Sequence, residues 1–315
     1  MDILFVADPL ASFKVYKDST YAMMAEAVRR GHGLWACEPE DLAWRDGRVA
    51  GHAGKVTLLQ HARQGDWFTA EAPEWRPLAG FGAVLMRKDP PFDEGYLNAT
   101  YLFEMAEREG ARVFNRPQAL RDYNEKLAIA RFPQFTVATL VSCRPDDIRA
   151  FMAEQGDIVV KPLNAMGGSG IFRLRPGDAN LGAILETVTD LGRRHIMAQR
   201  YIPEIADGDK RILLIAGEPV PYSLARIPAP GETRGNLAAG GTGVARPLTE
   251  RDREIAAALG PKLQAEGLLL VGLDVIGDWL TEVNVTSPTC FREITDQTGC
   301  DVAALFVDAL ERSCA

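Results

Sequence analysis

The segment Gly272-Leu273-Asp274-Val275-Ile276-Gly277-Asp278-Trp279-Leu280-Thr281-Glu282-Val283-Asn284-Val285 decides the expected fold, because two largely apolar strand patterns flank a Gly-Asp turn. Glu282 and Asn284 are two positions apart on a strand pattern, so their side chains project from one face. Asp274 shares that face if it pairs with Glu282 across an antiparallel hairpin. This register predicts an odd-length connection centred on Asp278.

The oxygen atoms of these three side chains suit a hard divalent cation such as Mg²⁺. The apolar residues between them predict a well-buried hairpin, in which two acids and an amide would be costly without a cation. The alternative is a solvated strand face with ordinary polar residues. We expect Asp274, Glu282 and Asn284 to bind Mg²⁺, with Mn²⁺ as the second candidate.

A second motif combines a lysine with a glycine-rich turn. The run Val159-Val160-Lys161-Pro162 is followed by Asn164-Ala165-Met166-Gly167-Gly168-Ser169-Gly170. A lysine at the end of a buried strand, before a turn whose backbone N–H groups can converge, suits phosphate oxygens. For this loop alone, a tight hairpin whose glycines serve only the turn is an equal alternative. The Walker A spacing GxxxxGK[ST] is absent, so any nucleotide is bound in another way.

The first third of the chain alternates expected strands with expected helices. Strands are predicted over Ile3–Val6 and Ala83–Met86, and helices over Thr20–Arg30 and Tyr96–Glu109. This alternation predicts a doubly wound parallel sheet, whose ligands lie beyond the carboxyl ends of the strands. The pattern breaks at Pro117, so we place the end of this domain at residue 121.

The rest of the chain divides into two α+β units. Residues 122–202 form a small central unit with helices over 145–155 and 181–191. Residues 203–315 form the last unit, which ends with the carboxylate hairpin. Within it, residues 228–247 contain five glycines and three prolines without a hydrophobic period. A loop of that length inside a compact domain is commonly a functional lid or disordered.

Composition narrows the class of protein. A chain of 315 residues, 47% apolar and 25% charged, indicates a soluble fold of two or three domains. Its 35 basic and 43 acidic residues are spread along the sequence, which disfavours general nucleic-acid binding. The five cysteines lack CxxC spacing, and neither a signal peptide nor an apolar stretch of about 18 residues occurs. We therefore expect reduced thiols, a cytoplasmic location and no membrane partner. HExxH and GxSxG motifs are absent, which argues against a zinc or serine hydrolase.

Lys126 lies in a predicted short helix, and together with Lys161, its glycine loop and the D-x7-E-x-N hairpin it resembles the ATP-grasp superfamily. Longer stretches, between about residues 3 and 310, resemble the bacterial glutathione synthetase family. The most specific are Leu85-Met86-Arg87-Lys88-Asp89-Pro90-Pro91-Phe92-Asp93 and Gly231-Glu232-Thr233-Arg234-Gly235-Asn236-Leu237-Ala238-Ala239-Gly240-Gly241. The resemblance implies an α/β protein with an ATP-grasp fold. Its parts would be a Rossmann-like pre-ATP-grasp substrate domain (1–121), a lid domain (122–202) and a catalytic domain (203–315) with a lid loop at 228–247.

The resemblance also implies an ATP-dependent carboxylate–amine ligase. Its substrates would be ATP, γ-L-glutamyl-L-cysteine and glycine, and the dipeptide carboxylate would be activated as an acyl phosphate on the way to glutathione, ADP and phosphate. A homotetramer is implied, with Trp35 and Trp44 as candidate interface positions. Two alternatives stay open: an ATP-grasp ligase with another peptide or amino-acid substrate, and a regulatory module without turnover. Such a module would be expected to lose one of Lys126, Lys161, Arg211, Glu282 and Asn284, and all five are present.

Roles for the individual site residues follow from the same resemblance. Lys126 and Lys161 would hold the nucleotide phosphates under a loop containing Asn164, Gly167, Gly168, Ser169 and Gly170. The adenine hinge would be Gln199, Tyr201 and Ile202, with Asp209 near the ribose. Arg211 would lie close to the transferring phosphoryl group, with Arg226 and Arg234 as further catalytic cations facing the peptide. The other peptide contacts would be Asp18, Ser19, Arg87, Ser287 and Thr289.

Overall fold

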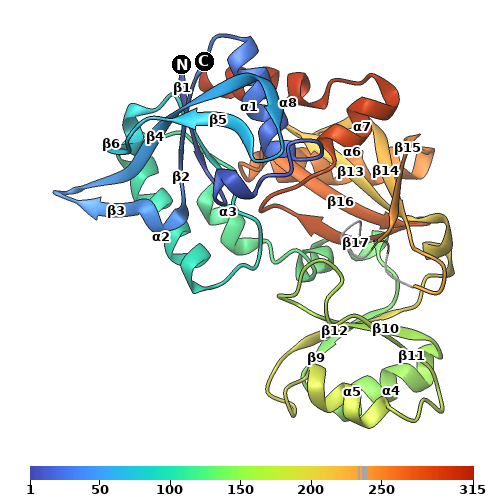
Figure 1. Cartoon of the computed structure of the whole chain (residues 1–315). Coiled ribbons are helices and arrows are strands. Elements are labelled where there is room, and N and C mark those ends of the chain that lie inside the picture. The colour runs from blue at the N-terminus through green and yellow to red at the C-terminus, as the bar shows by residue number, and fades with distance from the viewer. Residues whose placement is uncertain (233–234, 236–239) are drawn as a thin grey trace.

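The computed structural model describes residues 1–232, 235 and 240–315. Within them the strands form three sheets, of eight, four and five strands. Figure 1 shows the eight-stranded and five-stranded sheets side by side, while the four-stranded sheet and its two helices are set apart from both. This is the mixed α/β arrangement that the sequence predicts.

The centre of the first sheet is parallel, as the alternation of strands and helices predicts. Strands β2, β1, β7 and β8 lie in that order and pair in parallel. The bounds are β1 Asp2–Val6, β2 Gly33–Cys37, β7 Ala83–Met86, β8 Val113–Phe114, α1 Ser19–Arg29, α2 Glu94–Arg108 and α3 Pro117–Asp122. Helix α1 begins after Asp18, whose side chain accepts a hydrogen bond from the Tyr21 N–H at 2.9 Å.

One edge of this sheet is antiparallel, so the expectation of a parallel sheet is incomplete there. Strand β4 (Arg48–Arg63) pairs in the antiparallel sense with β2 and with three further strands: β3 Leu42–Arg45, β5 Asp66–Ala70 and β6 Glu74–Pro77. Strands β3, β5 and β6 are largely exposed and lack a buried apolar run. Hydrophobic periodicity therefore does not predict them. Trp44 on β3 is 58% exposed, whereas Trp35 on β2 is only 7% exposed and is unavailable to an interface.

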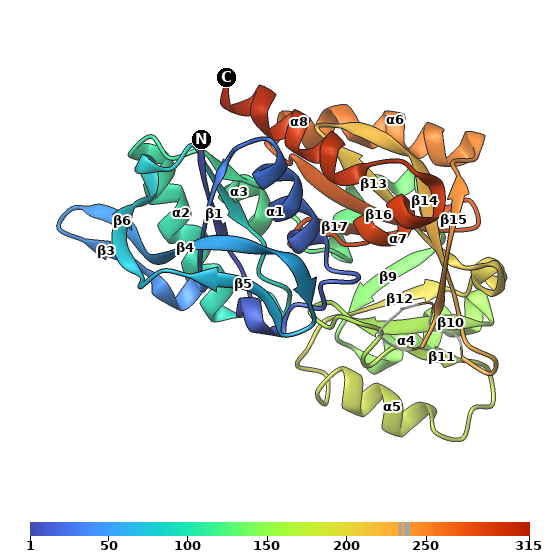
Figure 2. The same cartoon turned by 45° about the horizontal axis from the view of Figure 1, so that its top comes forward.

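The four-stranded sheet is antiparallel and packs around a hydrophobic core of its own. Its order is β11-β10-β12-β9, and α4 and α5 cover one face. The bounds are β9 Thr139–Ser142, α4 Pro145–Gln155, β10 Ile158–Pro162, β11 Phe172–Leu174, α5 Leu181–Val188 and β12 Ile196–Arg200. Figure 2 shows α5 on the outer side, away from the other sheets. Val160 faces this core, while its neighbour Lys161 lines the cavity described below.

The five-stranded sheet is antiparallel throughout, in the order β15-β14-β13-β16-β17. The bounds are β13 Asp209–Ile215, β14 Glu218–Ile227, β15 Thr242–Pro247, α6 Glu250–Ala265, β16 Leu270–Ile276, β17 Trp279–Asn284, α7 Phe291–Thr298 and α8 Val302–Cys314. Strand β15 takes the last six residues of the expected 228–247 loop. A short edge strand containing Gly243 and ending in Pro247 has no periodic apolar signal, which is why the sequence pattern missed it.

The β16–β17 hairpin confirms one half of its prediction and corrects the other. Asp274 pairs with Glu282 as expected, but Ile276 pairs with Trp279, so the turn has two residues rather than an odd number. The register shifts between Asp274 and Val275, which leaves Thr281 as the extra residue of a β-bulge. The bulge returns Glu282 to the face of Asp274, and the Thr281 hydroxyl donates to the Asp274 carbonyl at 3.1 Å.

Apolar packing joins the first and third sheets. One cluster of buried side chains includes Leu4 and Val84 of the first sheet with Leu273 and Val283 of the third. The four-stranded sheet contributes chiefly to its separate cluster. Among the described residues, no helix is long and apolar enough to cross a membrane.

Candidate active site

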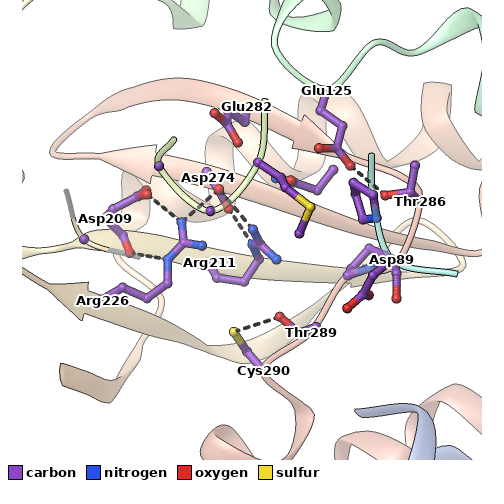
Figure 3. Close-up of a pocket in the computed structure, with 18 of the residues that line it drawn as sticks. Asp89, Glu125, Asp209, Arg211, Arg226, Asp274, Glu282, Thr286, Thr289 and Cys290 are labelled. Carbon is purple, nitrogen blue, oxygen red and sulfur yellow. Dashed lines mark hydrogen bonds and ion pairs between the residues drawn. The ribbon is translucent and has the colours of Figure 1, made fainter. Parts of the chain in front are cut away.

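A cavity of about 630 Å³ lies where elements of all three sheets meet. Its lining includes every expected site residue except Asn164, Gly170 and Arg234. Asn164 lines an adjoining cavity of about 180 Å³, and Gly170 lines neither of the two. Arg234 lies outside the described residues. Side chains far apart in the sequence are thus brought to one place, and Figure 3 shows a group of them.

Lys126 and Lys161 enter the cavity from different segments and meet at one carboxylate. Their ammonium nitrogens lie 3.5 and 3.8 Å from Glu282 Oε1. Lys126 also donates to the Ala165 carbonyl at 2.6 Å, and Lys161 to the Thr281 carbonyl at 3.2 Å. Burial lowers the pKa of Lys161, and the attraction of Glu282 opposes this shift. The two cations are therefore held close together beside the glycine-rich loop.

Local backbone contacts explain why Lys126 reaches the hairpin. The Glu125 carbonyl accepts a hydrogen bond from the Val283 N–H at 2.8 Å, which fixes this segment against β17. Asn124 Oδ1 accepts from the N–H groups of Lys126 and Leu127 at 3.2 and 3.0 Å. These bonds satisfy the first donors of a short 3₁₀ helix over Leu127–Arg131.

The hairpin oxygens fit a metal that arrives with a polyphosphate. Among the described residues, no three His, Cys, Asp or Glu side chains gather as a metal-binding group. The hairpin instead offers two carboxylates and one amide, because Asp274, Glu282 and Asn284 all line the cavity. The Asn284 amide nitrogen donates to the Gly272 carbonyl at 3.2 Å. Mg²⁺ is commonly bound by one or two carboxylates, with phosphate oxygens and waters supplying the remaining ligands.

Two arginines and two aspartates form a buried ion-pair cluster beside this hairpin (Figure 3). Arg211 donates to both Asp274 oxygens, at 2.5 and 3.0 Å. Arg226 lies 2.8 Å from Asp274 Oδ2 and 2.5 Å from Asp209 Oδ2. The two arginines hold the pKa of Asp274 well below its usual range. Burial raises the pKa of Asp209 to about 7 despite the attraction of Arg226.

The segment expected to be a lid touches this cluster at a described residue. A β-carbon at Gly235 would lie 2.4 Å from the Arg226 carbonyl oxygen and 3.1 Å from the β-carbon of Asp209. The backbone at Gly235 therefore lies against the chain at Arg226 and Asp209 as closely as a residue without a side chain allows.

Arg87 also lines the cavity, as a buried cation without a counter-ion in the described part of the chain. It is 5% exposed and forms no ion pair among the described residues. Its guanidinium donates to the Thr20 hydroxyl at 3.1 Å and to the Pro288 carbonyl at 3.0 Å. Burial lowers its pKa, with Asp89 and Asp18 opposing from a distance. A buried, unneutralised guanidinium is suited to bind a carboxylate in two-point fashion.

Glu125 and Thr286 also line the site, and the sequence patterns predicted no role for either. The Thr286 hydroxyl donates to Glu125 Oε1 at 2.7 Å, as Figure 3 shows. Burial raises the pKa of Glu125. Glu125 could have been suggested as a site residue because it precedes Lys126 in the chain. Its contact with Thr286, 161 positions away, could not be predicted from the sequence.

The fold and this site together define an ATP-grasp ligase, an enzyme that uses ATP to join a carboxylate to an amine. Two solved structures with the same fold are D-cycloserine synthetase DcsG (TM-score 0.68, 17% identity, 99% of each chain) and the ATP-grasp ligase PsnB complexed with minimal precursor, Mg and ADP (TM-score 0.62, 17% identity, 99% and 98%). At this identity they establish the fold alone.

Comparison at the sequence level is more specific. Residues 1–121 match the family model of the prokaryotic glutathione synthetase N-terminal domain, and residues 125–299 match that of its ATP-grasp domain. The glutathione synthetase of Nitrosomonas europaea is 60% identical, covering 100% of this chain and 99% of the relative. That of Ralstonia nicotianae is 58% identical, covering 99% and 96%. The chain belongs to the prokaryotic glutathione synthetase family.

Proposed function

We propose that this protein joins γ-L-glutamyl-L-cysteine to glycine at the expense of ATP, forming glutathione, ADP and phosphate. Relatives that are 58–60% identical over the whole chain support this substrate assignment. The observation that carries it is one cavity lined both by the unneutralised Arg87 and by the Lys126–Lys161 pair. The first suits a peptide carboxylate and the second suits a polyphosphate.

The reaction takes two steps. An oxygen of the dipeptide's cysteinyl carboxylate attacks the γ-phosphorus of ATP, and ADP leaves. The glycine nitrogen then attacks the acyl carbon and loses a proton, and inorganic phosphate leaves with one former carboxylate oxygen. Lys126 and Lys161 hold the phosphates in place, while Arg211, Arg226 and Arg234 stabilise charge on the transferring group.

Asp274, Glu282 and Asn284 would hold the metal that accompanies ATP. When bound, Mg²⁺ neutralises phosphate charge and so assists attack by an anionic carboxylate. We propose that Mn²⁺ can replace Mg²⁺, because oxygen ligands suit both ions.

The adenine hinge is assigned to Gln199, Tyr201 and Ile202, with Asp209 toward the ribose. Two contacts support a fixed hinge: the Tyr201 N–H donates to the Asp157 carbonyl at 2.9 Å, and the Arg173 guanidinium carbon lies 3.4 Å from the centre of the Tyr201 ring. At the peptide end we assign Asp18, Ser19, Ser287 and Thr289. The Ser287 hydroxyl donates to the Arg87 carbonyl at 3.2 Å, which places it beside the proposed carboxylate contact.

Replacing Arg87 with methionine should raise the KM for the dipeptide by roughly 10–10²-fold, the value of one or two hydrogen bonds to a charged group. The KM for ATP should change little, because Arg87 contacts Thr20 and Pro288, whereas the two lysines meet at Glu282. Arg87→Lys keeps the charge and loses the two-point geometry. Its KM for the dipeptide should therefore lie between those of the native enzyme and of Arg87→Met. Equal increases in both KM values for Arg87→Met would contradict the assignment.

A phosphate-release assay tests the substrate assignment. We expect rapid release with ATP, Mg²⁺, γ-glutamylcysteine and glycine together, and much slower release when either the dipeptide or glycine is omitted. Other dipeptides and amino acids serve as matched replacements. Faster release with a different carboxylate or amine would identify another ATP-grasp ligase.

The wider organisation is part of the proposal. We assign a pre-ATP-grasp substrate domain to residues 1–121, a lid domain to 122–202 and a catalytic domain to 203–315, with the lid loop at 228–247. We also propose a homotetramer in the cytoplasm, where ATP is available, with exposed Trp44 as a candidate interface residue. Sedimentation equilibrium of the native enzyme and of Trp44→Ser would test the assembly.

A further inference from the structure

Strand β16 places a glycine directly beneath the side chain of Arg211. In the sheet, Arg211 lies opposite Asp274 and Leu213 opposite Gly272. Gly272 and Asp274 are two residues apart, so they face the same side of the strand. A β-carbon at Gly272 would lie 2.8 Å from Cδ, 3.1 Å from Nε and 3.3 Å from Cζ of Arg211. These are the three nearest atoms, so the space beside Gly272 is filled by one side chain.

The glycine is needed for space rather than for backbone conformation. Its φ angle lies outside the left-handed range in which other residues are strained. An alanine there would be acceptable to the strand itself, and the conflict would arise only with Arg211. Because both guanidinium bonds of Arg211 to Asp274 depend on its present position, a shift of the stem would break their geometry.

The same residue also supports the second strand of the hairpin. The Gly272 carbonyl accepts from the Asn284 amide at 3.2 Å, and Asn284 is its partner across the ladder. Gly272 therefore contacts an expected phosphoryl-binding cation through its missing side chain and an expected metal ligand through its backbone.

We propose that Gly272 is a positioning residue for Arg211. It lets the arginine lie flat on β16 with its guanidinium beside Asp274, and thereby aims that cation at the transferring phosphoryl group. The inference rests on the proposed role of Arg211 in phosphoryl transfer. It requires no direct contact between Gly272 and either substrate.

The test is a double-mutant cycle of Gly272→Ala and Arg211→Ala, with Gly80→Ala as the control. A β-carbon at Gly80 meets no atom within 4 Å. In the native background, Gly272→Ala should lower kcat by on the order of 10²-fold, because a displacement of about 1 Å in a catalytic group has effects of that size. The KM for ATP should change little. In the Arg211→Ala background the three atoms nearest to the added methyl group are gone, so kcat should change by less than about twofold.

Thermal unfolding of the same four proteins provides a readout that does not depend on turnover. Gly272→Ala should lower the unfolding midpoint in the native background and leave it unchanged in the Arg211→Ala background. Equal effects of Gly272→Ala in both backgrounds, on kcat and on the midpoint, would overturn the proposal and indicate a general packing role. If the midpoints couple while Arg211→Ala leaves kcat intact, the packing is right and the role of Arg211 is wrong, which overturns the positioning role.

The double-mutant cycle can be measured with whichever carboxylate and amine the enzyme uses, so its outcome is independent of the substrate assignment. Should another carboxylate or amine prove to be the substrate, the cycle is measured with that pair, because Arg211 would serve phosphoryl transfer there as well. The proposed role of Gly272 can therefore be tested even if γ-glutamylcysteine is not the substrate.

Discussion

Replacing Arg211 with alanine is expected to lower kcat by roughly 10²–10³, as expected for the loss of one fixed group that stabilises developing charge. Arg211 is buried, 6% exposed, and its guanidinium is held beside the hairpin by two bonds to Asp274. Because the charge that it stabilises develops during transfer, the KM for ATP should change far less than kcat. Steady-state phosphate release measures both.

Two variants control for this experiment. Arg253→Ala removes an exposed arginine from α6, outside the cavity and the proposed lid loop, and should leave kcat unchanged. Arg211→Lys keeps a charge in the site and should retain more activity than Arg211→Ala. Circular dichroism is needed beside the kinetics, since Arg226 would be the one ion-pair partner left to Asp274 among the described residues. A folded Arg211→Ala enzyme with native kcat would remove Arg211 from the mechanism.

Replacing Glu282 with glutamine is expected to lower the rate at fixed Mg²⁺ by at least about 10²-fold, because even second-shell changes around metals cost 10–10²-fold. The substitution keeps the shape of the side chain and removes the charge on which Lys126 and Lys161 converge. The Mg²⁺ concentration needed for half-maximal rate should rise. Calorimetric titration of ADP with and without Mg²⁺ reports metal coupling without turnover.

The turn of the same hairpin offers a matched control. Asp278 is exposed and lies between the two strands, so Asp278→Asn removes a carboxylate four residues from Glu282 without entering the cavity. It should retain native kinetics and metal dependence. An Asp278→Asn enzyme as impaired as Glu282→Gln would point to a general charge effect on the hairpin rather than to a metal ligand.

For the β16–β17 hairpin, the sequence pattern predicted the facing of the side chains but not the length of the turn. Alternation placed Glu282 and Asn284 on one face, and the requirement that Asp274 join them gave the right partner across the ladder. The turn was wrong because a β-bulge at Thr281 restores the register after a two-residue turn. A bulge and an odd-length turn have the same effect on facing, so alternation alone cannot distinguish them.

Some strands and the long-range side-chain contacts could not be predicted from the sequence, for other reasons. Strands β3, β5 and β6 are largely exposed, and β15 is a short edge strand, so none of these four carries a strong apolar period. The ion pair between Arg211 and Asp274 joins residues 63 positions apart, and the Glu125–Thr286 bond joins residues 161 apart. The first contact depends on the pairing of β13 with β16 within one sheet, and the second on the packing of the Glu125 segment against β17. No local pattern encodes either of them.

The most direct test of the account follows the carboxylate oxygen. With γ-glutamylcysteine labelled with ¹⁸O in its cysteinyl carboxylate, the enzyme, ATP, Mg²⁺ and glycine should release inorganic phosphate that carries one labelled oxygen per glutathione formed. Mass spectrometry of the phosphate measures this transfer. Glutathione formed together with unlabelled phosphate would contradict an acyl phosphate, and with it the assigned roles of Lys126, Lys161 and Arg211.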